Sequence, residues 1–131
     1  MKILWIVFWM TLTSAVVAGD LRDVVNSMTD VSIEVLAGGQ EVLAASNGLT
    51  LYTFDNDSNG VSTCFGACLA AWPVIATELD QVPAPFSIHV RPDGVKQLVL
   101  GAQPLYFFVG DSSAGDINGD GLGGVWHIIK L

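Results

Sequence analysis

Basic residues are scarce in this sequence: Lys and Arg number five against 13 Asp and Glu, and the formal net charge at pH 7 is -8. Proteins that bind nucleic acids or anionic membranes carry clustered basic side chains that attract phosphate groups. An acidic chain with so few cations lacks that surface. The composition therefore predicts no nucleic-acid partner.

The common catalytic motifs are also missing. The sequence contains no Gly-x-Ser-x-Gly elbow, no His-Glu-x-x-His pair, no phosphate-binding loop and no dinucleotide fingerprint. It has only two His and two Cys, so nucleophilic catalysis has few candidate residues. We assign no catalytic residue from the sequence, and a role other than enzyme is favoured.

The apolar N-terminus predicts export. A basic start at Lys2 is followed by an apolar run from Ile3 to Val17, and a small residue, Ala18, offers a cleavage site. We predict that residues 1–18 form a signal peptide and that the mature protein is secreted or periplasmic; an uncleaved anchor is the alternative. Cleavage would leave four Lys and Arg against 13 Asp and Glu, a net charge of -9. After cleavage we expect no membrane insertion.

The spacing of apolar residues changes after this segment. Residues 19–30 carry apolar side chains at helical intervals and are predicted to form a short helix or a linker. From residue 31 apolar and polar residues alternate, and turn signals such as Gly38-Gly39 and Pro92-Asp93-Gly94 separate the runs. Residues 31–131 are therefore predicted to form a single β-rich domain of successive antiparallel hairpins.

One motif occurs twice. Residues 51–57 and residues 105–111 both read Leu-Tyr-x-Phe-x-x-Asp, and in each copy a Trp follows the Asp after 15 residues. Every matched position is 54 residues from its counterpart. The motif residues are Tyr52, Phe54, Asp57 and Trp72 in the first copy and Tyr106, Phe108, Asp111 and Trp126 in the second.

The repetition predicts the fold. Two strand-loop units that cannot each bury an apolar face should pack around one core. With repeat 1 at about residues 42–76 and repeat 2 at about 96–130, we predict an all-β fold: a small antiparallel β-sandwich or barrel of two pseudo-symmetric repeats. A short helical turn is expected near Cys68–Trp72, ahead of Pro73.

These motifs resemble a known family. The Tyr-x-Phe-x-x-Asp copies, with the segments at 62–68 (Ser-Thr-Cys-Phe-Gly-Ala-Cys) and 71–73 (Ala-Trp-Pro), are similar to the secreted-repeat family of predicted lipoproteins with a Yx(FWY)xxD motif. Residues 91–94 and 123–127 resemble its second-repeat pattern. The resemblance implies an extracytoplasmic protein with tandem repeats and no settled activity. No Cys lies at the cleavage site, so this chain departs from the lipid-anchored members.

The repeated motif favours a structural role. Tyr and Phe two positions apart lie on one face of a strand, and the Asp three positions further falls at the strand end, where it can accept hydrogen bonds from loop amides. The functional alternative is that the pseudo-symmetry brings Asp57 and Asp111 together as a paired carboxylate or cation site, as a hydrolase would need.

Cys64 and Cys68 are the two cysteines of the chain. In an oxidising compartment so close a pair most simply forms a structural disulfide. A regular helix holds residues four apart too far from one another for this bond, so we predict a distorted turn that Gly66 makes easy. The alternative is a copper or redox site, in which the two thiolates act with a distant histidine, His127 or His89.

Asp116, Asn118 and Asp120 stand at alternate positions before Gly121, as in the first half of a calcium loop. The twelfth position is His127, where such a loop needs a bidentate Glu. A Gly-rich turn is the preferred interpretation, and weak calcium binding is the alternative.

Three functional hypotheses follow. The preferred one is a non-catalytic binding or interaction module of the cell envelope, without a cofactor, whose partner is an envelope protein or a small ligand. The second is a copper-handling or redox accessory protein that uses Cys64 and Cys68, and free thiols in the exported protein would favour it. The third is a carboxylate-dependent hydrolase that uses Asp57 and Asp111.

Overall fold

The computed structural model describes residues 18–131. Residues 1–17 of the predicted signal peptide lie outside the described residues, and Ala18 begins the first helix. Within 18–131 we find no helix that is both long enough and apolar enough to cross a membrane.

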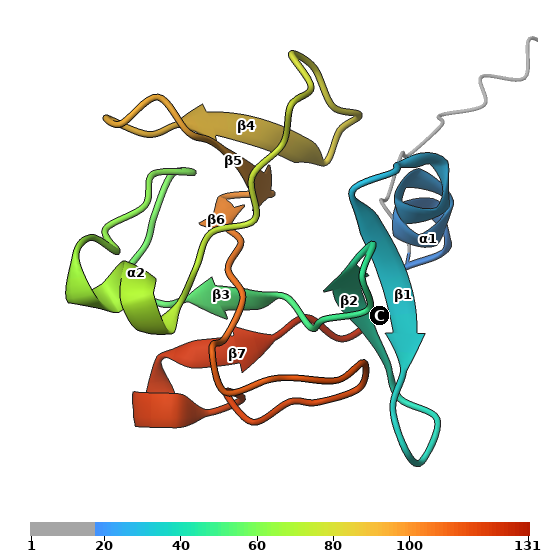
Figure 1. Cartoon of the computed structure of the whole chain (residues 1–131). Helices are drawn as coiled ribbons and strands as arrows, with labels where there is room; N and C mark the ends of the chain where they lie inside the picture. The colour runs from blue at the N-terminus through green and yellow to red at the C-terminus, as the bar shows by residue number, and fades with distance from the viewer. Residues whose placement is uncertain (1–17) are drawn as a thin grey trace, which may run out of the picture.

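Short strands make up most of the regular structure (Figure 1). The helices are α1 (Ala18–Ser27), α2 (Ala67–Ala71) and the 3-10 turn η1 (Leu122–Gly124). The strands are β1 (Val31–Val35), β2 (Glu41–Ala45), β3 (Tyr52–Phe54), β4 (Phe86–Val90), β5 (Lys96–Leu100), β6 (Gln103–Pro104) and β7 (Trp126–Ile128). They form three antiparallel sheets, in which β1 pairs with β2, β3 pairs with β7, and β5 lies between β4 and β6.

The predicted all-β class of antiparallel strands in two repeats is confirmed, but the barrel alternative is wrong. Each sheet has only two or three strands, so none curls far enough to close on itself. The expected helical turn is present as α2. Gly66 precedes it with φ of 58°, in the left-handed region where glycine carries little strain.

The two large hairpins are built alike. In the β1–β2 hairpin the Leu36 N–H donates to the Gln40 carbonyl at 2.8 Å, and in the β4–β5 hairpin the Arg91 N–H donates to the Val95 carbonyl at 2.9 Å. These bonds are 55 residues apart. The structural repetition therefore includes β1 and β4, which lie upstream of residues 42 and 96.

The C-terminal segment of each repeat pairs with the other repeat. Leu43 of β2 donates its N–H to the Ile129 carbonyl at 2.9 Å, and its counterpart Leu98 of β5 donates to the Ile75 carbonyl at 3.0 Å. The end of repeat 1 thus pairs with repeat 2, and the end of repeat 2 pairs with repeat 1. Each repeat therefore depends on the other to hold its C-terminal segment.

A pseudo-two-fold axis passes between Tyr52 and Tyr106. The Tyr52 N–H donates to the Tyr106 carbonyl at 2.8 Å, and the Tyr106 N–H donates to the Tyr52 carbonyl at 3.0 Å. This reciprocal pair joins the Tyr positions of the two copies of the motif. It places the motif side chains of both repeats in one region of the molecule.

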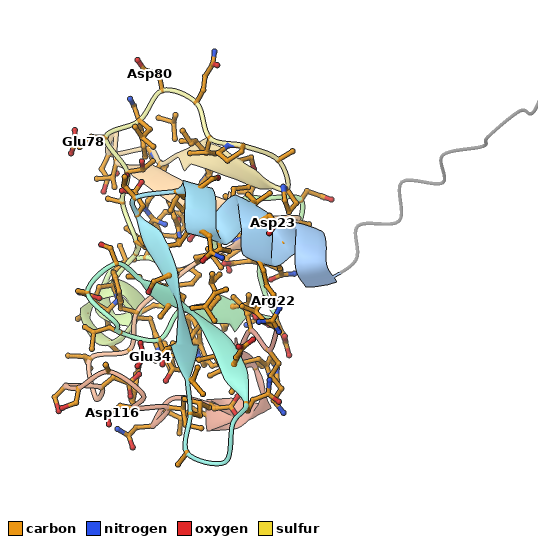
Figure 2. All side chains as sticks on the ribbon, turned by 90° about the vertical axis from the view of Figure 1, so that its right-hand side faces the viewer. Arg22, Asp23, Glu34, Glu78, Asp80 and Asp116 are labelled. Atoms are coloured by element: carbon orange, nitrogen blue, oxygen red, sulfur yellow. A yellow bond between two sulfur atoms is a disulfide. The ribbon has the colours of Figure 1, made fainter. Side chains whose placement is uncertain are left out.

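Two apolar clusters fill the interior. One lies between the hairpins, where Leu43 and Leu98 are fully buried, and α1 covers it with the fully buried Val25. Figures 1 and 2 show α1 lying against β1, and an ion pair between Arg22 and Glu41 ties α1 to β2. The other cluster is aromatic and lies beside α2. Burial of each large apolar side chain contributes about 1.5–3 kcal/mol, so both clusters hold the repeats together.

Candidate functional site

Each Tyr of the repeated motif binds the Asp of the other repeat. The Tyr52 hydroxyl donates to Asp111 Oδ2 at 2.6 Å, and the Tyr106 hydroxyl donates to Asp57 Oδ2 at 2.5 Å. Both Tyr side chains are fully buried, and the exposed fractions of Asp57 and Asp111 are only 2% and 8%. The motif therefore joins the two repeats through side chains as well as through the backbone.

The second oxygen of each carboxylate holds its own loop. Asp57 Oδ1 accepts the Thr63 N–H at 2.7 Å and the Thr63 hydroxyl at 2.8 Å, and Asp111 Oδ1 accepts the Asn118 N–H at 2.9 Å. Burial, and then the bond to a carboxylate, raise the pKa of both the Tyr52 and the Tyr106 phenol above the usual range. Both phenols therefore stay protonated at neutral pH and act as donors.

This arrangement bears on the hydrolase hypothesis. Both oxygens of Asp57 and both oxygens of Asp111 are occupied by donors from the protein, and the two side chains are nearly inaccessible to solvent. A general acid or base must reach the substrate or a water molecule. The geometry instead suits carboxylates that lock the fold.

The remaining motif residues form a column of four aromatic rings. Phe54 stacks on Trp126 at 4.1 Å between centroids, Trp126 stacks on Trp72 at 3.8 Å, and Phe108 lies 4.5 Å from Trp72 at a tilt of 30°. The two indoles are parallel to within 3°. Each Phe thus contacts the Trp of the other repeat. The aromatic column therefore joins the two repeats, as the Tyr–Asp hydrogen bonds do.

The Tyr rings close the sides of this column. Tyr52 meets Trp72 edge to face at 5.3 Å, and Tyr106 meets Trp126 in the same way at 5.2 Å. Edge-to-face and offset contacts are the geometries that the ring quadrupole favours. The absence of a side chain at Gly119 makes room for the column, because a Cβ there would lie 2.7 Å from Trp72.

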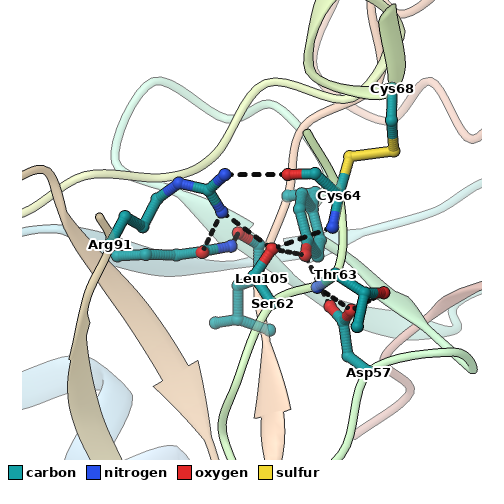
Figure 3. Close-up of a disulfide and its surroundings, with 9 residues drawn as sticks. Asp57, Ser62, Thr63, Cys64, Cys68, Arg91 and Leu105 are labelled. Atoms are coloured by element: carbon teal, nitrogen blue, oxygen red, sulfur yellow. Dashed lines mark hydrogen bonds between the residues drawn. A yellow bond between two sulfur atoms is a disulfide. The ribbon is translucent and has the colours of Figure 1, made fainter. Parts of the chain in front are cut away.

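Arg91 is buried beside this site, although its sequence context predicts no role for it. Its guanidinium donates to Ser62 Oγ at 2.7 Å, to Gln97 Oε1 at 3.0 Å and to the Cys64 carbonyl at 2.7 Å (Figure 3). Only 3% of the residue is exposed, and no carboxylate among the described residues forms an ion pair with it. Phe65 covers the guanidinium, with its ring centroid 5.0 Å away.

A chain of hydroxyl groups connects this cation to Asp57. The Tyr106 hydroxyl gives its one proton to Asp57, so the bond of 2.6 Å between Ser62 and Tyr106 must use the proton of Ser62. Ser62 in turn accepts from Arg91. Every donor therefore points from the guanidinium toward the carboxylate, and the positive and negative charges stabilise each other through two polarised hydroxyl groups.

The structure joins Cys64 and Cys68 by a disulfide (Figure 3). Cys64 is fully buried in the aromatic cluster, and its carbonyl is the one that accepts from Arg91. The bond lies at the start of α2, which leads directly to Trp72. In this oxidised state neither sulfur is a thiolate, so the pair has no free ligand to offer copper.

Replacing both cysteines by alanine is expected to lower the free energy of unfolding by about 2 kcal/mol, the value for closing so short a loop. Chemical denaturation of the exported protein measures this. A thiol reductant should bring the native protein down to the level of the Cys64→Ala/Cys68→Ala variant and should leave that variant unchanged. Stabilisation of the reduced native protein by Cu(I) would instead support the copper hypothesis.

The predicted calcium ligands hold their own loop. Asp116 Oδ2 accepts the N–H groups of Ser112 and Ser113, each at 3.0 Å, and these bonds, that of Ser112 first, hold the pKa of its carboxyl below the usual range. Asn118 donates its side-chain amide to a loop carbonyl, and Asp120 accepts an N–H of β7. Across residues 18–131 no group of three or more His, Cys, Asp or Glu is arranged to hold a metal ion.

The two histidines lie on different strands. His127 of β7 contacts Asp55 at 2.8 Å in a half-exposed pair. His89 of β4 lies opposite Gln97 and is partly exposed. An exposed ion pair of this kind contributes little to stability.

An uncharged surface surrounds α2. The sequence carries no Asp, Glu, Lys or Arg between Asp57 and Glu78, and α2 has no buried residue of its own. We define the α2 face as the exposed residues Phe65, Ala67, Ala70 and Val109; Phe65 is 53% and Val109 is 65% exposed. Val109 belongs to repeat 2 and is held to the end of α2 by its N–H, which donates to the Ala71 carbonyl at 2.9 Å.

Comparison with known proteins gives one match. A family model described as a secreted repeat of unknown function matches residues 38–76 and 87–130, which confirms the resemblance based on the Tyr-x-Phe-x-x-Asp copies. No curated protein and no solved structure matches. The two matched ranges correspond to the two repeats, and each includes part of the hairpin that precedes the motif.

Proposed function

Because this chain belongs to the family of secreted repeats of unknown function, we propose that it is a non-catalytic binding module that acts outside the cytoplasm. The α2 face is its binding surface, and its partner is a protein of the cell envelope.

One observation carries the proposal. The eight motif side chains are engaged with one another in the Tyr–Asp bonds and in the aromatic column, and so they build a scaffold. The exposed side chains of Ala67, Ala70 and Val109 take no part in this scaffold, and Phe65 covers the Arg91 guanidinium while remaining 53% exposed. Exposed apolar groups gathered on a rigid scaffold are typical of protein interaction sites.

The chemistry of this surface favours a protein over other partners. The net charge of the molecule is strongly negative, so phosphate-rich surfaces of nucleic acid or anionic lipid are repelled. The α2 face itself is uncharged, and it has one exposed aromatic residue, Phe65, that can act as an anchor. Apolar side chains of a second protein can cover it without burying a charge.

Photo-crosslinking in the producing cells tests the proposal. A benzophenone amino acid at Ala70 or at Val109 is expected to give one discrete adduct of higher mass, because both positions belong to the α2 face. Val35 is the matched control, since it is 59% exposed but lies at the end of β1, away from α2 (Figure 1). This control should give no such adduct.

A second variant distinguishes specific binding from nonspecific crosslinking. Ala67→Glu places a charge in the α2 face at an exposed position, so it should abolish the adduct and leave the unfolding midpoint unchanged. The proposal is wrong if Val35 captures the same species, or if the adduct survives the added charge.

A further inference from the structure

We propose that two copies of this chain exchange repeats, so that repeat 1 of one copy and repeat 2 of the other form the closed unit that one chain forms alone. The partner is a second copy of this chain. The interface is the one already seen between the two repeats.

The contacts that close the molecule run between repeats. They include the pairing of β3 with β7, the reciprocal backbone bonds of Tyr52 and Tyr106, the two Tyr–Asp bonds and the stacked indoles of Trp72 and Trp126. None of these contacts requires that both repeats belong to one chain. Two copies that exchange repeats would reproduce all of them twice, with no new interface to create.

Only a short connection keeps the two repeats together in one chain. Residues 78–84 link the end of repeat 1 to β4, and Figure 2 shows Glu78 and Asp80 projecting outward from this segment. Its clearest attachments are an exposed ion pair between Asp80 and Lys96 and the partly buried Val82. Such attachments contribute little, so the folded-back linker is weakly held.

The linker can reach a second copy. Seven residues in extended form span about 23–25 Å. Closure within one chain corresponds to an effective concentration of about millimolar for a short linker. A single chain should therefore predominate at micromolar concentration, and exchange should appear near millimolar concentration or when the linker is too short to fold back.

Changing the linker length tests this. Deleting Leu79–Val82 from the exported protein should convert it from monomer to dimer at micromolar concentration, as measured by light scattering after size-exclusion chromatography. Inserting four Gly and Ser residues at the same site is the matched control and should leave the protein monomeric. A shortened chain that remains a folded monomer would overturn the proposal.

A covalent link shows which copy supplies each repeat. Val42 and Lys130 face each other on antiparallel segments of different repeats, between the bonds Leu43–Ile129 and Leu131–Glu41, so two cysteines there can form a disulfide. We would refold Val42→Cys/Lys130→Cys with the native linker at millimolar concentration and separate the dimer. Exchange predicts that this dimer keeps twice the chain mass on a non-reducing denaturing gel.

The engineered disulfide still tests the proposal if the chain with the shortened linker fails to fold, because the disulfide variant keeps the native linker. If the dimer separates on that gel into single chains, each with the new disulfide inside one chain, the two copies had associated through their surfaces. That result would contradict repeat exchange. So would the absence of any dimer after refolding at millimolar concentration. If the exchange occurs, each dimer presents two α2 faces, which makes binding bivalent; this last consequence rests on the proposed function, whereas the mass of the linked species does not.

Discussion

Replacing Trp126 by alanine is expected to lower the free energy of unfolding by about 3–5 kcal/mol, the usual cost of removing a large buried ring. For a domain of this size the loss corresponds to a decrease of roughly 10–20 °C in melting temperature. The reason is its place in the column: Trp126 stacks on Phe54 of repeat 1 on one face and on Trp72 on the other, and it meets the edge of Tyr106. Its removal breaks contacts on both sides of the repeat interface.

The measurement has a spectroscopic signature besides the denaturation curve. Trp72 and Trp126 are the two indoles that follow the predicted signal peptide, which contains Trp5 and Trp9, so the measurement uses the chain that begins at Gly19. Parallel indoles with centroids 3.8 Å apart should give an exciton couplet in the far-ultraviolet circular dichroism spectrum. The couplet should vanish in Trp126→Ala and in Trp72→Ala alike.

A conservative variant completes this test. Trp126→Phe keeps a ring in the column and should lose less stability than the alanine variant, while the couplet still disappears. Pseudo-symmetry also predicts similar losses for Trp72→Ala and Trp126→Ala. A variant at either position that unfolds like the native protein would show that the column does not hold the repeats together.

The repeated motif could be predicted from the sequence because its residues recur at a constant offset of 54. Tyr, Phe, Asp and Trp are also the residue types whose burial and hydrogen bonding favour a structural role. The offset does not indicate which residue each motif side chain contacts. A motif shared by two repeats is equally compatible with Tyr52 bonding Asp57 of its own repeat and with the observed bond to Asp111.

The two hairpins are also related by the repeat, but at a different offset from the motif. Ser32-Ile33 and Ser87-Ile88 match at an offset of 55, not 54, because the connection between β2 and β3 is one residue longer than its counterpart in repeat 2. An offset held at 54 therefore loses the register upstream of the motif. The alternation of apolar residues still predicted both hairpins as strands.

Arg91 could not be recognised as a buried residue from local pattern. It follows β4 at the start of a Pro-Asp-Gly turn, where an arginine is normally exposed to solvent. At the equivalent position in repeat 1 stands Leu36, which is partly buried. Its burial depends on Ser62 and Cys64, which lie far away in sequence, so only the folded structure reveals it.

Asp57→Asn is expected to destabilise the protein by about 3 kcal/mol or more, because it removes the carboxylate that compensates a buried guanidinium. Asparagine keeps one acceptor oxygen, whereas the Tyr106 hydroxyl and two donors of Thr63 converge on both oxygens of Asp57. At least one buried donor is then left without an acceptor. Chemical denaturation at constant pH measures the loss.

Asp111→Asn is the matched control, since Asp111 holds the equivalent position in repeat 2. It accepts from Tyr52 and Asn118 in the same manner, but among the described residues no cation is connected to it through hydroxyl groups. The cost should be that of unsatisfied hydrogen bonds alone, about 1–3 kcal/mol. The difference between the two variants isolates the contribution of charge.

A double-mutant cycle with Arg91→Met tests whether that contribution comes from the chain of hydroxyl groups between Arg91 and Asp57. Removing the guanidinium removes the charge that Asp57 compensates, so Asp57→Asn should cost less in the Arg91→Met background, with a coupling energy of about 0.5–3 kcal/mol. Asp111 and Arg91 share no hydrogen-bond partner, and their changes should be additive. Equal coupling energies of Arg91 with both carboxylates would contradict a specific connection to Asp57 through the hydroxyl groups. Coupling to Asp57 alone would show that the two pseudo-symmetric carboxylates differ in electrostatic role, because only repeat 1 carries the loop from Ser62 to Cys68 that receives a cation from repeat 2.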